Sequence, residues 1–368
     1  MSLICNTSLK KADPTCQGCP WYDEGELTAP IFASSVNQPT FVIENPSMED
    51  FAYGEPLSSE RGEMVESWLS PEGEAGFSLS QCSKLYAVKC SNGSKKPGIK
   101  VLRACSEHLK TDIEYAQKMG SPITVSLGAT ATRAFITVKL FSSLQGSPLS
   151  VKFGKSDILL FPTLSPGQIL ARPADEGLVR KDFQNIIKLA QGESLEEFNS
   201  RGVTELVLLS TREKVIDFFT KVLPESRVVS FDVETTGFDP DLDQVTGNAL
   251  NYLDSKLLTL NFSVKEGEGV VLPLLGAAAK KIWSDVFMDE ISEMVKAVME
   301  NPEILWVIHN SGFDVPFVVE NYGVDLFKMK YVDSLLQSHL LWEEAPKDLK
   351  SLAKIHTNLG GYESVLGN

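Results

Sequence analysis

Two acids, Asp232 and Glu234, interrupt the apolar, β-branched run VVSFDVETTG at positions 228–237. In a β-strand, residues i and i+2 point to the same face, so both carboxylates would project from one sheet surface. Neighbouring carboxylates repel each other and lose hydration unless a cation lies between them. Because hard oxygen ligands suit Mg²⁺ or Mn²⁺, the spacing predicts a divalent metal site on this strand.

A third acid, Asp314, ends the segment IHNSGFD at positions 308–314, where an apolar strand is expected to run into a helix. Asp314 would lie in the first turn of that helix and could complete the metal cage. Asn310 would assist by hydrogen bonding to a substrate, and Phe313 by packing. A structural role stays open for each motif alone, because the helix macrodipole also favours an acid in the first turn.

The cysteines form a second group of potential ligands, since all six lie in the first 105 residues. In an intracellular protein, clustered cysteines indicate a metal more often than a disulfide. Cys16 and Cys19 form a C-x-x-C pair, and Cys90 and Cys105 add a second pair. Four thiolates suit tetrahedral zinc or a [4Fe–4S] cluster, and the spacing leaves both open.

Length, charge and hydropathy limit the class of protein. The 368 residues suggest two domains of ordinary size. The sequence has no apolar run of the roughly 18–20 residues that span a bilayer and no signal-peptide pattern, so we expect a cytoplasmic protein without membrane contact. The net charge of −15 argues against coating nucleic acid by bulk electrostatics. It does not exclude an enzyme that grips one nucleic-acid end, because bound cations reverse the local sign.

The elements that must position these residues divide at a polar, glycine-containing stretch, residues 191–203. Before it, apolar runs at 40–43, 123–127 and 158–161 alternate with amphipathic segments, including a helix at 178–190, a pattern typical of βαβ layers. After it, we predict strands at residues 205–209, 227–232, 257–264, 269–272 and 305–309, and helices at 213–223, 279–299 and 315–322. The predicted fold class is α/β in both parts, with a mixed sheet in the second.

The order FDVETTG and then HNSGFD resembles the first two motifs of the DEDD 3′→5′ exonucleases, and more narrowly the proofreading domain of family A DNA polymerases. The downstream segment at 331–356 is similar too, with Asp333 at a strand end opening a helix. The resemblance covers residues 203–368 and implies a ribonuclease H-like exonuclease domain with a mixed sheet.

This resemblance implies hydrolysis of 3′-terminal phosphodiesters by two Mg²⁺ or Mn²⁺ ions. The implied catalytic and metal-binding residues are Asp232, Glu234 and Asp314, and the implied substrate-binding residues are Thr235, Thr236, Asn310 and Phe313. The family's third motif, Tyr-x-x-x-Asp, is not matched, because Leu366 stands four residues after Tyr362. We therefore expect a domain truncated before that motif, with weak cleavage, since a half-built metal site misplaces its water.

The first part of the chain resembles, at greater divergence, the family 4 uracil-DNA glycosylases over about residues 5–190. The similar segments are FVIENPSMED (41–50), GEPL (54–57), Gly62, AVKC (87–90), ACSEHL (104–109), ITVSLG (123–128) and PTLSPGQIL (162–170). The resemblance implies a glycosylase-like α/β/α sandwich over residues 1–192. It also implies a [4Fe–4S] cluster on Cys16, Cys19, Cys90 and Cys105, which leaves Cys5 and Cys82 as spare, buried thiols.

The glycosylase-like pocket departs from the family at its reactive positions. Ser165 stands where the family has a catalytic His, and Tyr86 where it has an Asn. A glycosylase must stabilise a departing uracil anion and an oxocarbenium-like sugar, and Ser165 cannot supply a cation. Glu44 is retained and Asp50 could position water, but the catalytic set is broken. We therefore favour a non-catalytic, DNA- or base-sensing domain over an active glycosylase.

The whole chain thus resembles the N-terminal part of a bacteriophage-type family A DNA polymerase, a DNA replication protein of the host cytoplasm. The expected partners are single-stranded 3′ ends, primer–template DNA, and a polymerase domain in the same or a companion chain. Two alternatives remain: a catalytically silent DNA-binding or sensing fragment, and an active uracil-DNA glycosylase.

Overall fold

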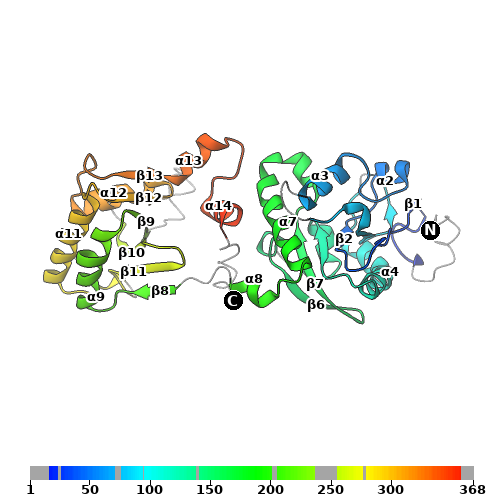
Figure 1. The fold of residues 1–368 in the computed structure, drawn as a ribbon, viewed down its shortest axis with the longest axis horizontal. Helices are drawn as coiled ribbons and strands as arrows, with labels where there is room; N and C mark the ends of the chain where they lie inside the picture. The colour runs from blue at the N-terminus through cyan, green and yellow to red at the C-terminus, as the bar shows by residue number, and fades with distance from the viewer. Residues whose placement is uncertain are drawn as a thin grey trace. The chain divides into compact units, whose positions relative to one another are not determined.

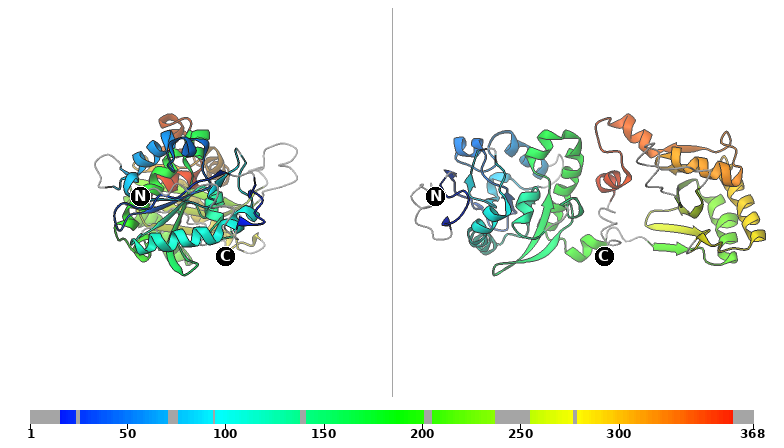
Figure 2. Two further views of the ribbon diagram at one scale, coloured as in Figure 1. Left: turned by 90° about the vertical axis from the view of Figure 1, so that its right-hand side faces the viewer. Right: turned by 180° about the vertical axis from the view of Figure 1, so that it is seen from behind.

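The computed structural model describes residues 16–23, 26–70, 76–93, 95–137, 141–200, 205–236, 255–276 and 279–357. The chain divides into two compact units, one of Met1–Arg201 and Lys350–Asn368 and the other of Gly202–Leu349. Each unit is a β-sheet layered with helices (Figures 1 and 2), so the predicted α/β class is confirmed. The assignment of residues 1–192 and 203–368 as functional domains stays a prediction.

The main sheet of the first unit has the strand order β3-β2-β5-β7-β6. Its strands are β2 (Thr40–Ile43), β3 (Ser83–Tyr86), β5 (Thr124–Leu127), β6 (Leu149–Phe153) and β7 (Ser156–Thr163). All pairs are parallel except β6 with β7. The chain passes from β2 to β3 on one side and then to β5 on the other, which puts a topological switch point between β2 and β5.

Helices cover both faces of this sheet, since its central strands are buried on both sides. One core contains Phe41 and Phe183 and lies where α3 (Ser59–Leu69) and α7 (Glu176–Ala190) pack against the sheet. The other gathers Val42 and Leu109 against α4 (Ile99–Lys118). The remaining elements are β1 (Glu26–Leu27), β4 (Cys90–Ser91), α2 (Met48–Tyr53), α5 (Ala129–Arg133), α6 (Pro166–Ala171) and α8 (Leu195–Ser200). This α/β/α layering agrees with the predicted one.

The sheet of the second unit is mixed, as predicted, with the strand order β13-β12-β9-β10-β11-β8. Its strands are β8 (Glu205–Leu208), β9 (Val228–Thr235), β10 (Leu257–Ser263), β11 (Glu268–Pro273), β12 (Leu305–Ile308) and β13 (Tyr331–Asp333). Strand β10 runs antiparallel to both of its neighbours, and the other pairs are parallel. The five strands predicted here are all present, with shifted ends.

The core of the second unit lies between this sheet and its helices. These are α9 (Arg212–Asp217), which continues into a π-helical turn (Phe218–Val222), α11 (Asp285–Met299) and α12 (Ser311–Tyr322), and α13 (Ser334–Leu341) follows. Helix α14 (Leu349–His356) belongs to the first unit from Lys350 onward. The helix predicted to begin at residue 279 begins at Asp285 instead. The reason is local: Ala279 has φ +52°, and the Ser284 hydroxyl caps α11 by accepting the Phe287 N–H at 3.3 Å.

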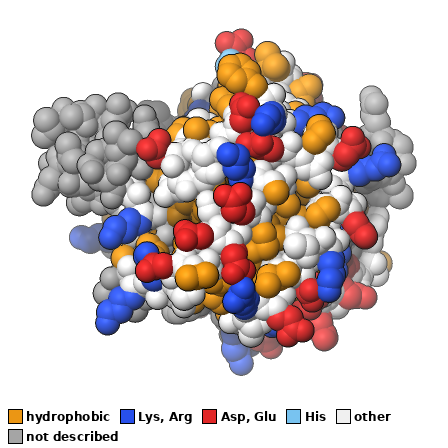
Figure 3. All heavy atoms as spheres, turned by 90° about the vertical axis from the view of Figure 1, so that its left-hand side faces the viewer, with side chains coloured by type: hydrophobic (Ala, Val, Ile, Leu, Met, Phe, Trp, Pro, Cys, Tyr) orange, Lys and Arg blue, Asp and Glu red, His pale blue; other side chains and the backbone are white. Residues whose placement is uncertain are grey.

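The end of the second unit that carries α9 and α11 has a mixed surface. Figure 3 shows acidic, basic and hydrophobic side chains interspersed on this side, with no continuous basic patch in view. The Arg212–Glu290 ion pair, in which Arg212 Nη2 lies 2.6 and 2.7 Å from the two carboxylate oxygens, joins α9 to α11 here. Across the described parts of the chain, no helix has the length and apolar character needed to cross a membrane.

Candidate functional site

The acidic pair lies on the open face of β9. Residues along this strand alternate, so Phe231 and Val233 enter the core while Asp232 and Glu234 reach solvent. Asn261 of β10 is paired in register with Asp232, and its Nδ2 donates to Asp232 Oδ2 at 3.2 Å. The structure thus places both predicted carboxylates on one face and adds a neutral amide beside them.

Asp314 approaches the same strand from the first turn of α12. The residue is only 2% exposed, and its Oδ1 accepts the backbone N–H of Val233 at 2.9 Å. Val233 stands between the two acids of β9 in sequence, so this hydrogen bond ties the third carboxylate to the centre of the pair. A helix acid that served only the macrodipole would need no contact with a strand so distant in sequence.

Burial makes the charged form of all three carboxyls less favourable. Burial raises the pKa of Asp314 to about 7; the Val233 hydrogen bond opposes this shift, and the charge of Asp232 adds to it. Burial also raises the pKa of Asp232, against the effects of Asn261 and His309. Burial and the charge of Asp232 raise the pKa of Glu234. A bound divalent cation would remove this repulsion, so the donor chemistry fits Mg²⁺ or Mn²⁺.

The ligands do not form a closed cage. Among the described residues, no three or more His, Cys, Asp or Glu side chains lie close enough together to hold a metal ion. The carboxylates of Asp232, Glu234 and Asp314 would therefore have to move toward a bound ion. Asp314 is the least free to move, because it is buried and hydrogen-bonded to the strand.

The predicted substrate-binding residues border this site. Thr235 ends β9, and the Thr236 hydroxyl accepts the Lys256 N–H at 2.9 Å. Asn310 is exposed and precedes α12 in a left-handed conformation, φ +60°. The Phe313 ring is half-buried and lies 5.5 Å from the ring of Phe317. Their contacts with a nucleotide stay predictions.

The sequence analysis missed two neighbours of the acids. Asn261 had a recognisable signal, because it is a polar residue within the apolar run of β10. His309 lies near enough to lower the pKa of Asp232, and its Nδ1 is 3.0 Å from the Ser334 hydroxyl. Nothing local in the sequence indicates these contacts, because the approach to Asp232 depends on the pairing of β12 with β9 and the contact with Ser334 on the pairing of β12 with β13.

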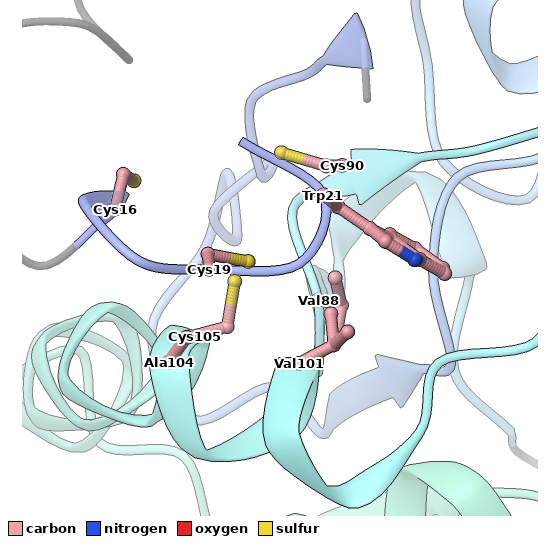
Figure 4. A pocket seen from close by; sticks show the side chains of 8 residues that line it. All are labelled: Cys16, Cys19, Trp21, Val88, Cys90, Val101, Ala104 and Cys105. Atoms are coloured by element: carbon pink, nitrogen blue, oxygen red, sulfur yellow. The ribbon is translucent and has the colours of Figure 1, made fainter. Parts of the chain in front are cut away.

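The four predicted cysteine ligands line one small pocket in the first unit (Figure 4). Cys16 and Cys19 come from a turn, Cys90 from β4 and Cys105 from α4. In Figure 4 the thiols of Cys19 and Cys105 point toward each other. These four donors suit a metal or cluster, although within the described residues no three of them are drawn together at metal-binding distance. The [4Fe–4S] or zinc assignment therefore stays a prediction.

The environment of these thiols is apolar. Burial raises the pKa of Cys105 to about 11, although a hydrogen bond from the Lys89 backbone opposes the shift. Cys16 Sγ lies 3.7 Å from His108 Nε2. Of the two thiols predicted to be spare, Cys82 is fully buried away from this pocket, and burial raises its pKa to about 12. Cys5 lies outside the described residues.

The predicted glycosylase-like residues lie at the carboxyl ends of the parallel strands. Glu44 follows β2, Tyr86 ends β3 and Ser165 follows β7. Gly128, which follows β5, has φ +92°, and a Cβ on it would meet Glu44 Oε1 at 3.1 Å and Ser165 Cβ at 3.3 Å. Glu44 and Ser165 therefore converge at the topological switch point.

The other two residues of this group are buried. Asp50 accepts the Ser47 N–H at 2.8 Å and so caps α2. Tyr86 is 1% exposed, and burial together with the charge of Asp50 raises its pKa. Its hydroxyl faces Asp50 but makes no hydrogen bond of normal geometry among the described residues.

Comparison with known proteins gives limited likeness. No protein-family model matches the chain. The DNA polymerase I of Pseudomonas aeruginosa is 27% identical over 138 residues, which is 37% of this chain and 14% of that protein. This chain therefore matches only a small part of the length of that relative.

Several solved nuclease structures superpose on part of the chain. They include Trypanosoma brucei RNase D (TM-score 0.28, 14% identity, 38% of this chain and 41% of that one). Brucella melitensis NrnC with bound Mg²⁺ has a TM-score of 0.26 and 16% identity, over 41% of this chain and 59% of that one. Escherichia coli RNase D has a TM-score of 0.28 and 12% identity, over 41% of this chain and 32% of that one. Structural likeness at this level is too low to assign a function.

Proposed function

We propose that the second unit is a 3′→5′ exonuclease module of a DNA polymerase, acting on single-stranded 3′ ends with two Mg²⁺ or Mn²⁺ ions. The observation that carries this proposal is the Asp314–Val233 hydrogen bond, which joins a buried third carboxyl to the acidic pair on an open sheet face. The similarity to DNA polymerase I supports the choice of a DNA substrate.

The three carboxylates would share the binding of the ions in this proposal, and Glu234 would have one further task. Asp232, Glu234 and Asp314 would hold the ions, which supply activation of the attacking water and stabilisation of the leaving 3′ oxygen. Asn261 donates to Oδ2 of Asp232, so Oδ1 would be the oxygen that binds an ion. Glu234, the most solvent-facing of the three, would help to orient the water. Thr236 and Asn310 border the place where a terminal nucleotide would lie.

Shortening of a 5′-labelled single DNA strand tests the proposal. We expect a ladder that grows from the 3′ end with Mg²⁺ or Mn²⁺ and stops when EDTA removes the metal, because the uncompensated carboxylates cannot hold a phosphate. A strand with phosphorothioate linkages at its 3′ end is the control and should resist. Cleavage that persists in EDTA, or that starts at the 5′ end, would contradict the proposal. Metal-independent binding without any cleavage would favour the silent DNA-binding alternative.

As a second candidate function, we propose that the first unit recognises a DNA base without excising it. Open α/β sheets bind ligands outside the carboxyl ends of their strands at a switch point, and Glu44 and Ser165 meet there. The Ser165 hydroxyl is already engaged in a capping box with Gln168, at 3.2 and 3.3 Å. It is therefore poorly placed to assist base departure.

A Gly128→Ala variant tests this second candidate with uracil- and thymine-containing strands. The added Cβ would crowd Glu44 in a backbone conformation that L-residues rarely adopt. We expect affinity for the preferred strand to fall at least about tenfold, which equals about 1.4 kcal/mol. Gly98→Ala is the control, because a Cβ added at Gly98 would meet nothing within 4 Å. Alkali-labile sites in uracil-containing DNA would contradict the proposal and indicate an active glycosylase.

A further inference from the structure

Asp333 stands at the junction of β13 and α13, next to the proposed nuclease site. As the N-cap of α13, its Oδ1 accepts the backbone N–H of Leu335 at 2.8 Å and that of Leu336 at 3.4 Å. An N-cap carboxylate satisfies amides that the helix itself leaves unpaired. This role alone would need only one of the two carboxylate oxygens.

The same carboxylate also holds the segment that leads into α12. Its Oδ2 accepts both the backbone N–H and the hydroxyl of Ser311 at 2.7 Å, and its Oδ1 accepts the Asn310 N–H at 3.1 Å. This reach across strands is possible because β12 and β13 are parallel and Ile308 is paired with Asp333. The neighbouring Ser334 hydroxyl contacts His309 Nδ1 at 3.0 Å. Asp333 and Ser334, at the junction of β13 and α13, therefore contact the three consecutive residues 309–311 that follow β12.

Two roles are chemically open to this carboxylate. It is close enough to Asp314 for its charge to raise the pKa of that residue, so it could be a fourth metal ligand. However, a carboxylate has about four lone-pair sites, and Asp333 already accepts five hydrogen bonds. A metal would have to break several of these charge-assisted bonds, which are stronger than neutral ones.

The hydrogen bonds to Asp333 also stabilise its charged form. Burial alone would raise the pKa of Asp333, but the hydrogen bonds from Ser311, Leu335 and Asn310 outweigh it and hold the pKa below its usual range. Asp333 is thus an anion whose oxygens are already satisfied by backbone N–H groups and a hydroxyl.

We propose that Asp333 is a positioning residue of the nuclease site and not a metal ligand. By fixing Asn310 in its left-handed conformation and Ser311 at the start of α12, it sets the first turn so that Asp314 reaches β9. The catalytic consequence rests on the proposed nuclease function. The anchoring itself does not, and it can be measured separately.

Asp333→Asn tests the proposal, because the amide keeps one acceptor oxygen but turns an NH₂ group toward N–H donors. We expect hydrogen exchange in the peptides that contain Asn310, Ser311 and Leu335 to accelerate at least about tenfold, the equivalent of one lost hydrogen bond. The cleavage rate should fall about a hundredfold, as expected for a small misplacement of catalytic groups. The Mn²⁺ affinity measured by calorimetry should fall clearly less than in Asp314→Asn, because all three carboxylates remain and only the position of Asp314 is loosened.

Two further variants make the test decisive. Asp325→Asn is the matched control, since Asp325 also accepts a backbone N–H, that of Phe327 at 3.1 Å, in an exposed loop. It should change neither exchange at residues 310–311 nor cleavage. Ser311→Ala removes only the hydroxyl bond to Asp333 and should give a smaller change in the same direction, even if Asp333→Asn does not fold.

Two results would overturn the proposal: unchanged exchange at Asn310 and Ser311, or a loss of Mn²⁺ affinity as large as that caused by Asp314→Asn. A wild-type protein without metal-dependent cleavage would refute the nuclease function instead. The exchange and calorimetric measurements would still decide the role of Asp333 in that case.

Discussion

Replacing Asp314 with Asn is expected to lower 3′-end hydrolysis about a thousandfold while making the metal-free protein more stable at pH 8. The two effects have one cause, because Asp314 is buried beside Asp232 with a pKa near 7. The substitution removes a charge that the metal needs and that the metal-free fold tolerates poorly. The amide oxygen of Asn can still accept the Val233 N–H, so the local geometry should survive.

The loss of activity follows from the metal chemistry. A lost ligand of a catalytic metal should remove about 4 kcal/mol of transition-state stabilisation, and each 1.36 kcal/mol is a factor of ten in rate. Single-turnover cleavage of a labelled strand at saturating Mn²⁺ measures this effect. Asp325→Asn, which changes the same residue type in a remote loop of the same unit, should cleave like the wild type.

The gain in stability follows from proton linkage. The pKa of Asp314 rises from 3.8 to about 7 on folding, so between these values the folded state binds more protons than the unfolded state. The stability of the wild type should therefore fall as pH rises from about 4 to about 7 and then level off. The upper bound of this loss is about 4 kcal/mol. The asparagine side chain of the variant does not titrate, so the loss should be absent from the variant.

Urea unfolding in EDTA at pH 5 and pH 8 checks this expectation. The variant should exceed the wild type in stability at pH 8 and approach it at pH 5. Adding Mn²⁺ should stabilise the wild type and leave the variant nearly unchanged, because a ligand that binds only the folded state shifts its stability by mass action. Unchanged cleavage, or a variant less stable than the wild type at pH 8 in EDTA, would refute the assignment of Asp314.

Local sequence pattern predicted the parts of this site that depend on one element. The period of two in β9 gave the shared face of Asp232 and Glu234, and the strand-to-helix transition placed Asp314 in the first turn of α12. In the first unit, the apolar runs at β2 and β5 were sufficient to predict layered strands.

Contacts between elements could not be predicted in this way. The Asp314–Val233 hydrogen bond joins residues 81 positions apart, and the Asn261–Asp232 bond depends on the register of two antiparallel strands. Asp333 could be recognised as a helix cap, but its hold on Ser311 follows only from the pairing of β12 with β13. The start of α11 was misplaced because the Ser284 cap outweighed the apolar pattern before it.

Replacing Cys19 with Ser is expected to release nearly all of a metal or cluster bound by the first unit and to lower the stability of that unit by several kcal/mol. Cys19 comes from a turn closed by the Cys19 N–H and the Cys16 carbonyl at 3.0 Å, and its thiol faces Cys105 of α4. A metal in this pocket would therefore join the turn to α4 and to β4, which carries Cys90. Apolar contacts, such as those of Trp21 and Val101, also hold the segment in place.

Cys82→Ser is the control, because Cys82 is a buried thiol that lies outside the pocket and donates to the Ser78 carbonyl. Iron, sulfide and zinc analysis of the purified proteins, with visible absorbance, measures occupancy, and proteolysis near residues 16–22 reports release of the turn. A [4Fe–4S] cluster and a tetrahedral zinc site can both use four thiolates, so the metal content must distinguish them. Iron with sulfide would identify the cluster, and zinc alone the tetrahedral site. Metal retained by Cys19→Ser, or lost equally from Cys82→Ser, would refute the site. In that case a metal would not hold the turn against α4. Apolar packing alone would then account for the four cysteines, from three elements, that line this pocket.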